Sequence, residues 1–172
     1  MEYCNCFKII PKEEIERVFR ESDTASAEMD PSFLCFEDAY RIAAGVANKD
    51  TVVLDFGCAY APQSYYFANC AKYIGIDLPF GNDVRFSPKN AEFYLMSGQQ
   101  FIEKILPNIV HNKYNTIAIC SWCPDRELQE MVKGFRNHIV CYGNEFDASF
   151  EDFKMDSPLS EYLSDDGKEI EM

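Results

Sequence analysis

Residues 51–59, Thr-Val-Val-Leu-Asp-Phe-Gly-Cys-Ala, constrain the fold of this chain more than any other segment. An apolar run ends there at an acid, Asp55, and a glycine, Gly57. A helix-like segment follows, and a second apolar run ends at another acid in Ile74-Gly-Ile-Asp77. The pattern predicts a β-α-β unit whose two carboxylates lie at the carboxyl ends of neighbouring parallel strands. Open α/β sheets bind nucleoside-like ligands at that edge.

The same alternation of strand and helix patterns continues to residue 142. Strands are expected at 52–56, 73–76, 92–95, 116–120 and 138–142, and helices near 64–71, 99–110 and 125–135. Alternating elements of this kind form a doubly wound parallel α/β sheet of the Rossmann type, with helices on both faces. Because crossovers between parallel strands are right-handed, few topologies are open, and we expect the strand order 3-2-1-4-5.

The 172 residues are expected to form one domain in three parts. Residues 1–50 contain two helix-type patterns, at 11–20 and 33–47, and are expected to form an N-terminal helical cap. Residues 51–145 are expected to form the Rossmann-like, ligand-binding core. Residues 146–172 are expected to form an acidic C-terminal tail.

The charge of the chain, −13 in total, is unevenly distributed. From Glu145 onward there are ten acids and two lysines, a net of −8, and the preceding residues hold nineteen acids and fourteen bases, a net of −5. Nucleic-acid binding requires clustered Lys and Arg, so we expect a small-molecule or protein partner and no DNA or RNA.

No apolar run reaches the roughly 18 residues of a membrane span, and residues 1–10 lack a secretory-signal pattern. We therefore expect a cytoplasmic protein without a membrane partner.

The eight cysteines are expected to be reduced thiols, because no secretory signal accompanies them. Cys120-Ser-Trp-Cys123 forms a C-x-x-C pair, to which Cys4 and Cys6 could add two thiols. Two pairs with the spacing of a zinc site are absent, so we expect no metal. A redox dithiol is also disfavoured, since no helix N-terminus clearly follows Cys120.

The expected ligand site combines one bare backbone turn with two acids. At Gly57 a ligand can lie against the backbone, and the N-terminus of the next helix offers N–H groups to an anion. Asp77 can accept hydrogen bonds from two ribose hydroxyls, and Asp55 can orient an ammonium group or cap a helix or loop. Dinucleotide and P-loop glycine patterns are missing. S-adenosylmethionine carries a carboxylate, an ammonium and a ribose but no phosphate, so it suits these groups.

These residues resemble the class I S-adenosylmethionine-dependent methyltransferase family over residues 33–145. Val53-Leu-Asp-Phe-Gly-Cys58 resembles the family's first motif, Gly75-Ile-Asp77 its second-strand acid, and Tyr94-Leu-Met-Ser-Gly98 the segment that contacts adenine after the third strand. Ile119-Cys-Ser-Trp-Cys-Pro124 and Tyr142-Gly-Asn-Glu145 are similar to the Ser-Trp-Pro-Pro and Tyr-x-Gly-Glu pairing of an uncharacterised branch.

The resemblance implies that S-adenosylmethionine, or its product S-adenosylhomocysteine, binds where the strands end. The implied cofactor contacts are Asp55, Gly57, Cys58, Ala59, Asp77, Leu78, Ser97, Gly98 and Ser121. Trp122 and Pro124 would face the methyl acceptor, although Trp122 suits a core or lid position equally well. Asp125 and Glu145 are candidate bases, and Asp125 also suits the N-cap of the next helix.

Three features depart from the family's pattern. Ala59 and Ala61 stand where the second and third glycines usually stand, which narrows the cofactor site. The second proline of the branch's strand-four motif is missing, since Cys123 precedes the only one, and the segment after residue 145 is too polar and short for the usual C-terminal β-hairpin. The fifth strand would then be an open edge, available to a second copy, unless the tail or a partner covers it.

We expect a methyltransferase-like protein acting on a small molecule or protein side chain. The alternative is a non-catalytic interaction module that has lost its cofactor.

Overall fold

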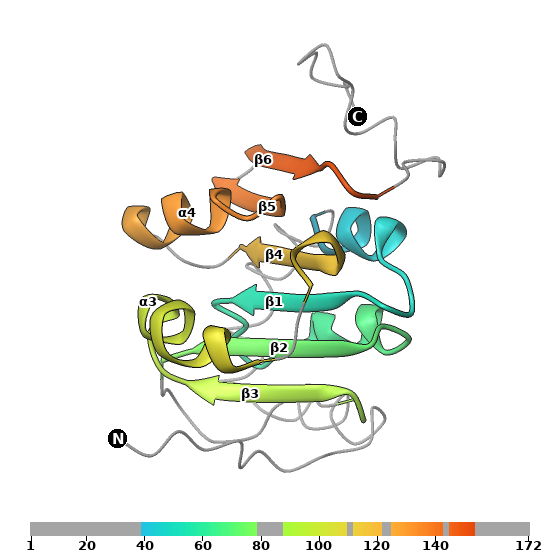
Figure 1. The fold of residues 1–172 in the computed structure, drawn as a ribbon, viewed down its shortest axis with the longest axis horizontal. Helices are drawn as coiled ribbons and strands as arrows, with labels where there is room; N and C mark the ends of the chain where they lie inside the picture. Colours follow the sequence, from blue (N-terminus) through green and yellow to red (C-terminus); the bar gives the residue numbers. More distant parts are fainter. Residues whose placement is uncertain (1–38, 79–87, 110–111, 122–124, 143–144, 154–172) are drawn as a thin grey trace, which may run out of the picture.

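The computed structural model describes residues 39–78, 88–109, 112–121, 125–142 and 145–153. These residues form a Rossmann-like α/β fold around a six-stranded mixed sheet with the order β3-β2-β1-β4-β5-β6 (Figure 1). The strands are β1 (Val52–Phe56), β2 (Lys72–Asp77), β3 (Ala91–Leu95), β4 (Thr116–Cys120), β5 (Asn137–Tyr142) and β6 (Glu145–Phe150). The first five strands are the expected ones in the expected order, and neighbours among them pair in parallel.

The order in which the chain adds strands to the sheet reverses between β1 and β4. From β1 the chain proceeds outward through β2 to β3 and then returns to β4 on the other side of β1. In the register of these strands, Asp55 lies opposite Gly75 of β2 and Ile119 of β4. The position between β1 and β4 is the topological switch point, where open α/β sheets form a crevice at the carboxyl ends of their strands.

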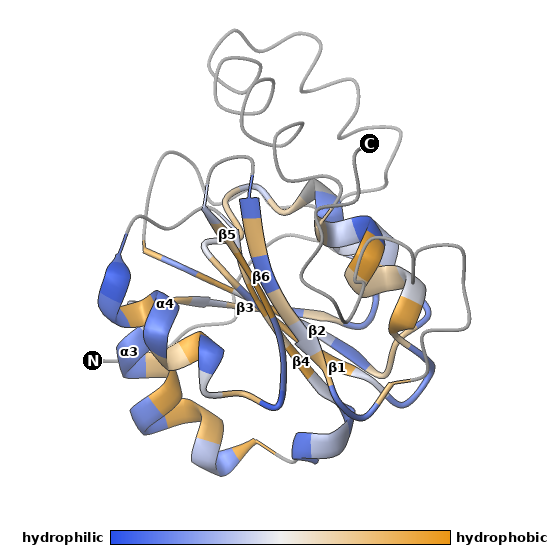
Figure 2. Cartoon of the chain, turned by 90° about the horizontal axis from the view of Figure 1, so that it is seen from above, coloured by the Kyte–Doolittle hydropathy of each residue, from blue (hydrophilic) through white to orange (hydrophobic). Residues whose placement is uncertain are grey.

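Helices cover both faces of the sheet (Figure 2). One face carries α3 with its continuations η2 and η3, and also α4; the other carries residues 39–46 and η1. The helical segments are residues 39–46, η1 (Pro62–Phe67), α3 (Gly98–Gln100), η2 (Phe101–Ile105), η3 (Leu106–Asn108), η4 (Lys113–Asn115) and α4 (Arg126–Lys133). The expected helix near 64–71 is thus a short 3-10 helix.

Side-chain alternation along β1 divides the core into two halves. Successive strand residues point to opposite faces, so Leu54 and Phe56 pack under α3 and α4, whereas Val53 packs under residues 39–46. Asp55 follows Val53 at the two-residue period and therefore shares the face that residues 39–46 cover. Of the expected cap, the structure describes this second helix; the pattern at 11–20 lies outside the described residues.

Strand β6 is the main difference from the expected topology. It pairs antiparallel with β5 from Asn137↔Phe150 to Tyr142↔Glu145, so the start of the expected tail covers the β5 edge. Phe146, Ala148 and Phe150 pack against the core, while Glu145 and Asp147 are exposed. This two-residue alternation is present in the sequence, but the acidic charge of the segment hides it. A dimer through an open sheet edge stays a prediction, and β5 does not offer that edge.

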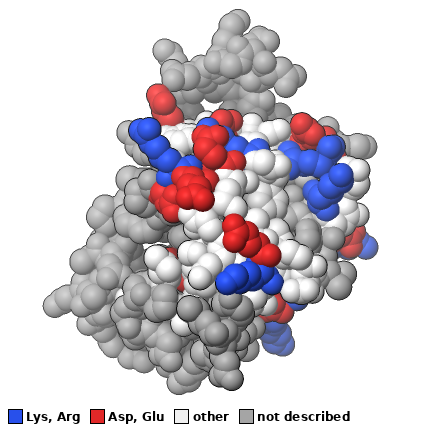
Figure 3. All heavy atoms as spheres, turned by 60° about the vertical axis from the view of Figure 1, so that its left-hand side comes forward, with Lys and Arg blue, Asp and Glu red and all other residues white. Residues whose placement is uncertain are grey.

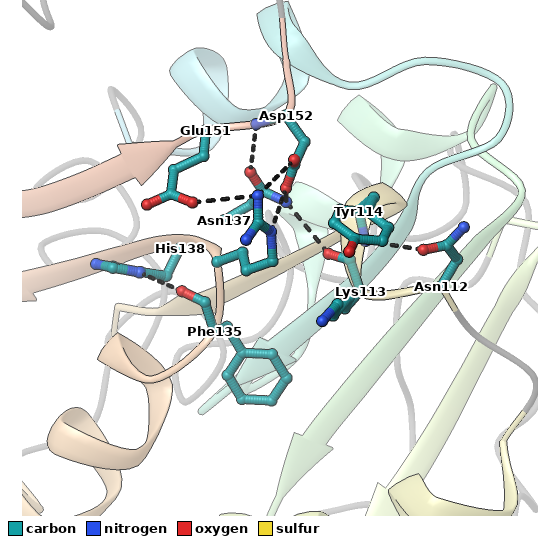
Figure 4. Close-up of polar contacts among 9 residues, drawn as sticks. Asn112, Lys113, Tyr114, Phe135, Asn137, His138, Glu151 and Asp152 are labelled. Carbon is teal, nitrogen blue, oxygen red and sulfur yellow. Dashed lines mark hydrogen bonds and ion pairs between the residues drawn. The ribbon is translucent and has the colours of Figure 1, made fainter.

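Polar contacts of Asn137 fasten the end of β6 to the start of β5 (Figure 4). Its Nδ2 donates to Asp152 Oδ2 (3.0 Å) and to the Lys113 carbonyl (3.3 Å), and its Oδ1 accepts from Asp152 N (3.2 Å). Arg136 adds two hydrogen bonds to the same carboxylate, of 3.0 and 2.9 Å, and thereby lowers the pKa of Asp152. Because buried polar groups require partners, this set of contacts fixes the register of the antiparallel pair.

Charged side chains of both signs are interspersed on the face that Figure 3 brings forward. Ion pairs join residues of adjacent elements, such as Lys72 with Glu92 at 2.8 Å and Lys133 with Asp147 at 3.7 Å. Within the described ranges, no helix combines the length and apolar character that crossing a membrane requires.

Candidate functional site

Asp77 ends β2 and holds the loop that follows β1. Its Oδ2 accepts a hydrogen bond from Ala59 N (2.9 Å), and its Oδ1 accepts one from Leu78 N (2.8 Å). Gly57 N donates to the Ile76 carbonyl at 2.7 Å, which joins the same loop to β2. Asp77 is half-buried and Leu78 is 59% exposed. Asp77 therefore lies, partly exposed, at the carboxyl edge of the sheet.

The loop between β1 and η1 has a left-handed backbone at three positions. The φ angles are 80° at Gly57, 49° at Ala59 and 59° at Ala61. The two alanines occupy the expected positions of the family's second and third glycines, so the backbone has a glycine-type conformation while carrying methyl groups. This conformation costs an L-residue roughly 1–2 kcal/mol. Hydrogen bonds from Ala59 N to Asp77 and from Ala61 N to the Cys58 carbonyl (2.8 Å) hold the loop in it.

The end of β3 lies beside the end of β2. Met96 N donates to the Asp77 carbonyl at 2.9 Å, which brings Ser97 and Gly98 close to the acid along the chain. Ser97 caps α3, since its Oγ accepts from Gln100 N at 3.2 Å. A Cβ at Gly98 would lie 2.5 Å from a methyl carbon of Leu128, so close packing of α3 on α4 requires glycine there. The structure thus groups the residues expected to bind cofactor from the loop, β2 and β3.

Asp55 occupies a different environment, within a set of side chains that we call the tyrosine cluster: Tyr40, Asp55, Gln63, Tyr73 and Ser121. Asp55 is 0% exposed. Its Oδ1 accepts from the Tyr40 hydroxyl (3.0 Å), and its Oδ2 accepts from Gln63 Nε2 (2.8 Å) and from the Tyr73 hydroxyl. The Tyr40 hydroxyl also forms a hydrogen bond with Ser121 Oγ. Residues from the helix at 39–46, η1 and β2 therefore donate to one carboxylate of β1, and Tyr40 connects it to Ser121 at the end of β4.

The electrostatics of the tyrosine cluster follow from its burial. Removal from water raises the pKa of Asp55 to about 6, against the hydrogen bonds from Tyr73, Gln63 and Tyr40, which lower it. Burial, followed by the nearby charge of Asp55, raises the pKa of both Tyr40 and Tyr73 well above the ordinary value. Both tyrosines consequently stay protonated and act as donors, so the carboxylate is stabilised by hydroxyl and amide dipoles.

Asp125, expected either as a base or as a cap, is the N-cap of α4 in the structure. Its Oδ1 accepts from Leu128 N (3.2 Å) and its Oδ2 accepts from Gln99 Nε2 (2.7 Å). These hydrogen bonds, with Gln99 first, lower the pKa of Asp125. An acid with a lowered pKa is ionised at neutral pH and is a weaker proton acceptor. Helix capping accounts for the position of Asp125.

The remaining expected residues are scattered or lie outside the described residues. Glu145 is exposed at the start of β6, and Cys58 is buried in the loop after β1. Cys58, Cys70, Cys120 and Cys141 form no disulfide. Among the described residues, no group of three or more His, Cys, Asp or Glu is arranged to hold a metal ion. Trp122, Pro124 and the other cysteines of the considered zinc site, Cys4, Cys6 and Cys123, fall in the ranges that the structure leaves undescribed.

Sequence reasoning missed Tyr40, Gln63 and Tyr73 as partners of Asp55. Tyr40 fits the apolar face of a helix and Tyr73 fits a strand, so each satisfies its local pattern without a polar role. A usable signal was present, because buried tyrosine hydroxyls usually find a hydrogen-bond partner. Two buried tyrosines on the face that carries a buried acid indicate such a cluster once the register is known.

No protein-family model matches the chain, and no curated protein matches it. Among solved structures, the chain is similar to SMU.1697c, described as a putative methyltransferase from Streptococcus mutans, in complex with SAH. The two share 12% sequence identity with a TM-score of 0.45, over 62% of this chain and 69% of the other. A similarity of this size does not extend to ligand or substrate.

Proposed function

We propose that this chain binds S-adenosylmethionine at the carboxyl ends of β1, β2 and β3, and methylates a small molecule or a protein side chain. One observation carries the proposal: Asp77, half-buried at the end of β2, holds Ala59 in a left-handed loop of the glycine-rich type. Such an acid and such a loop, on adjacent parallel strands beside the switch point, suit a ligand that contains a ribose.

Each group of the ligand has a corresponding group on the chain. The Asp77 carboxylate can accept from the ribose hydroxyls, because an ionised carboxylate has only acceptor positions. Gly57 has no Cβ, so the ligand can approach the backbone of the loop. Ser97 and Gly98 continue the chain from β3 beside Asp77 and can border the base. When bound, S-adenosylmethionine supplies a sulfonium methyl group, whose transfer depends chiefly on alignment with the acceptor.

Thermal unfolding with S-adenosylhomocysteine tests the proposal. A ligand that binds only the native state stabilises it by mass action, by about 2.7 kcal/mol at a hundredfold excess over Kd. We expect a higher Tm for the wild type and no shift for Asp77→Asn. The matched control is Asp50→Asn, at an exposed turn before β1 on the opposite edge of the sheet, which should keep the full shift. Absence of a wild-type shift at millimolar ligand would overturn the proposal.

A second function, that of a non-catalytic interaction module, is favoured by the tyrosine cluster. Asp55 was expected to orient the ammonium of the cofactor, but it is completely buried and accepts from three side chains of the protein itself. A wild-type protein that unfolds cooperatively but gains no stability from S-adenosylhomocysteine would support this second function.

A further inference from the structure

We propose that Tyr40 determines the ligand class of this site: the site accepts 5′-thioadenosyl compounds, and it does not recognise an amino-acid group through Asp55. The inference rests on the proposed function and deepens it, because it states which part of the ligand is bound. Its structural basis is the position of the Tyr40 hydroxyl between the ends of β1 and β4.

Tyr40 bridges the switch point of the sheet. β1 and β4 are the neighbours between which the strand order reverses, and Asp55 lies opposite Ile119 in their register. Ser121 directly follows β4. The Tyr40 hydroxyl donates to Asp55 and also contacts Ser121 Oγ, so a single side chain occupies the polar groups of both strand ends.

No part of Asp55 is accessible to a ligand. It is 0% exposed, and three donors from the helix at 39–46, from η1 and from β2 converge on its two oxygens. A ligand ammonium could reach it only by displacing a donor, and displacement of Tyr40 would break two hydrogen bonds. The helix that carries Tyr40 is itself held down, since Ala39, Ala43 and Val46 are buried in the core beneath it.

The Asp77 side of the site has the opposite character. Asp77 is half-buried, Leu78 is exposed, and the Asp77 carboxylate accepts hydrogen bonds from backbone N–H groups of the loop and of the strand end. Recognition by a strand-end acid is therefore possible at the ribose end of the ligand, through Asp77, and is blocked at Asp55. A ligand with the adenosyl thioether alone should satisfy the site as well as one that carries the amino acid.

Calorimetric titration with S-adenosylhomocysteine and 5′-methylthioadenosine tests this inference, because the two share the adenosyl thioether and only the first has an ammonium and a carboxylate. We expect the two dissociation constants to agree within about threefold. Hydrogen bonds to charged groups contribute on the order of tenfold to a hundredfold in affinity. A methylthioadenosine affinity more than about thirtyfold weaker would overturn the inference and leave the proposed function intact.

Two variants distinguish the contribution of Asp77 to binding from that of Asp55. Asp77→Asn should weaken both ligands by the same factor. Asp55→Asn should leave the ratio of the two dissociation constants unchanged, and a loss confined to S-adenosylhomocysteine would show that Asp55 contacts the amino acid, which overturns the inference. If the folded wild type binds neither ligand, the proposed function and this inference both fail.

Discussion

Asp55 and Asp77 look alike in the sequence and have opposite environments in the structure. Each acid ends an apolar run, two residues before a glycine at Asp55 and two after one at Asp77. Asp55 is completely buried and accepts from side-chain hydroxyls and an amide, whereas Asp77 is half-buried and accepts from backbone N–H groups. A strand-end acid therefore stays partly exposed or becomes an internal anchor according to what packs over it.

Strand register explains the difference. Asp55 lies opposite Gly75, so Asp77 extends two residues further toward the carboxyl edge of the sheet. At a rise of about 3.3 Å per residue, this places the two acids roughly 7 Å apart along the strand direction. The inner position lies beneath the helix at 39–46 and receives Tyr40, while the outer position lies where the chain leaves the sheet.

The largest expected effect is a pH dependence of stability that originates in Asp55. Its pKa is about 6 in the folded protein against an ordinary 3.8, so between these values the native state holds the proton more tightly than the unfolded chain. The free energy of unfolding therefore falls as pH rises through this window. The shift corresponds to roughly 3 kcal/mol. We expect urea unfolding to show that wild-type stability falls by about this amount, relative to Asp55→Asn, between pH 4 and pH 7.

The matched control for this experiment is Asp50→Asn, the same exchange at an exposed turn. It reports the cost of the substitution away from the tyrosine cluster. If the free energy of unfolding of the wild type, relative to that of Asp55→Asn, stays constant or rises with pH, the burial of a charged Asp55 is contradicted.

A smaller loss is expected from Tyr73→Phe. The substitution removes a hydroxyl donor from a buried carboxylate, and hydrogen bonds to charged groups contribute about 1.5–3 kcal/mol. We expect the variant to be less stable by about 2 kcal/mol at pH 7.5, and by less at pH 4.5, where Asp55 is protonated. Tyr114→Phe, at a tyrosine that is 47% exposed, should cost under about 0.5 kcal/mol. Equal costs in the two variants would show that the hydroxyl of Tyr73 does not stabilise Asp55.

The sequence predicted the five parallel strands because each is an apolar run of strand length between helix-type patterns. It did not predict β6, where Phe146, Ala148 and Phe150 alternate with polar residues inside an acidic segment. The acidic charge of the segment indicated a tail, but only the inward face of an edge strand needs to be apolar.

The site was predicted in its positions but not in its contacts. Asp77 and the loop at Ala59 lie together as the β-α-β pattern requires. The partners of Asp55 come from 15 residues before it and 8 and 18 residues after it, and only tertiary packing brings them together. A pattern of single residues along the chain does not contain that information.

The smallest expected effect concerns the loop that Asp77 holds. Ala59 has φ 49°, and its replacement by glycine removes a steric cost of roughly 1–2 kcal/mol. Glycine also gives the unfolded chain more conformational freedom, which costs about 0.5–1 kcal/mol. We expect Ala59→Gly to stabilise the protein by about 0.5 kcal/mol in urea unfolding. Ala68→Gly, at an exposed residue with φ −61°, should instead destabilise it by a similar amount. If both variants lose stability equally, the left-handed loop stores no strain at Ala59.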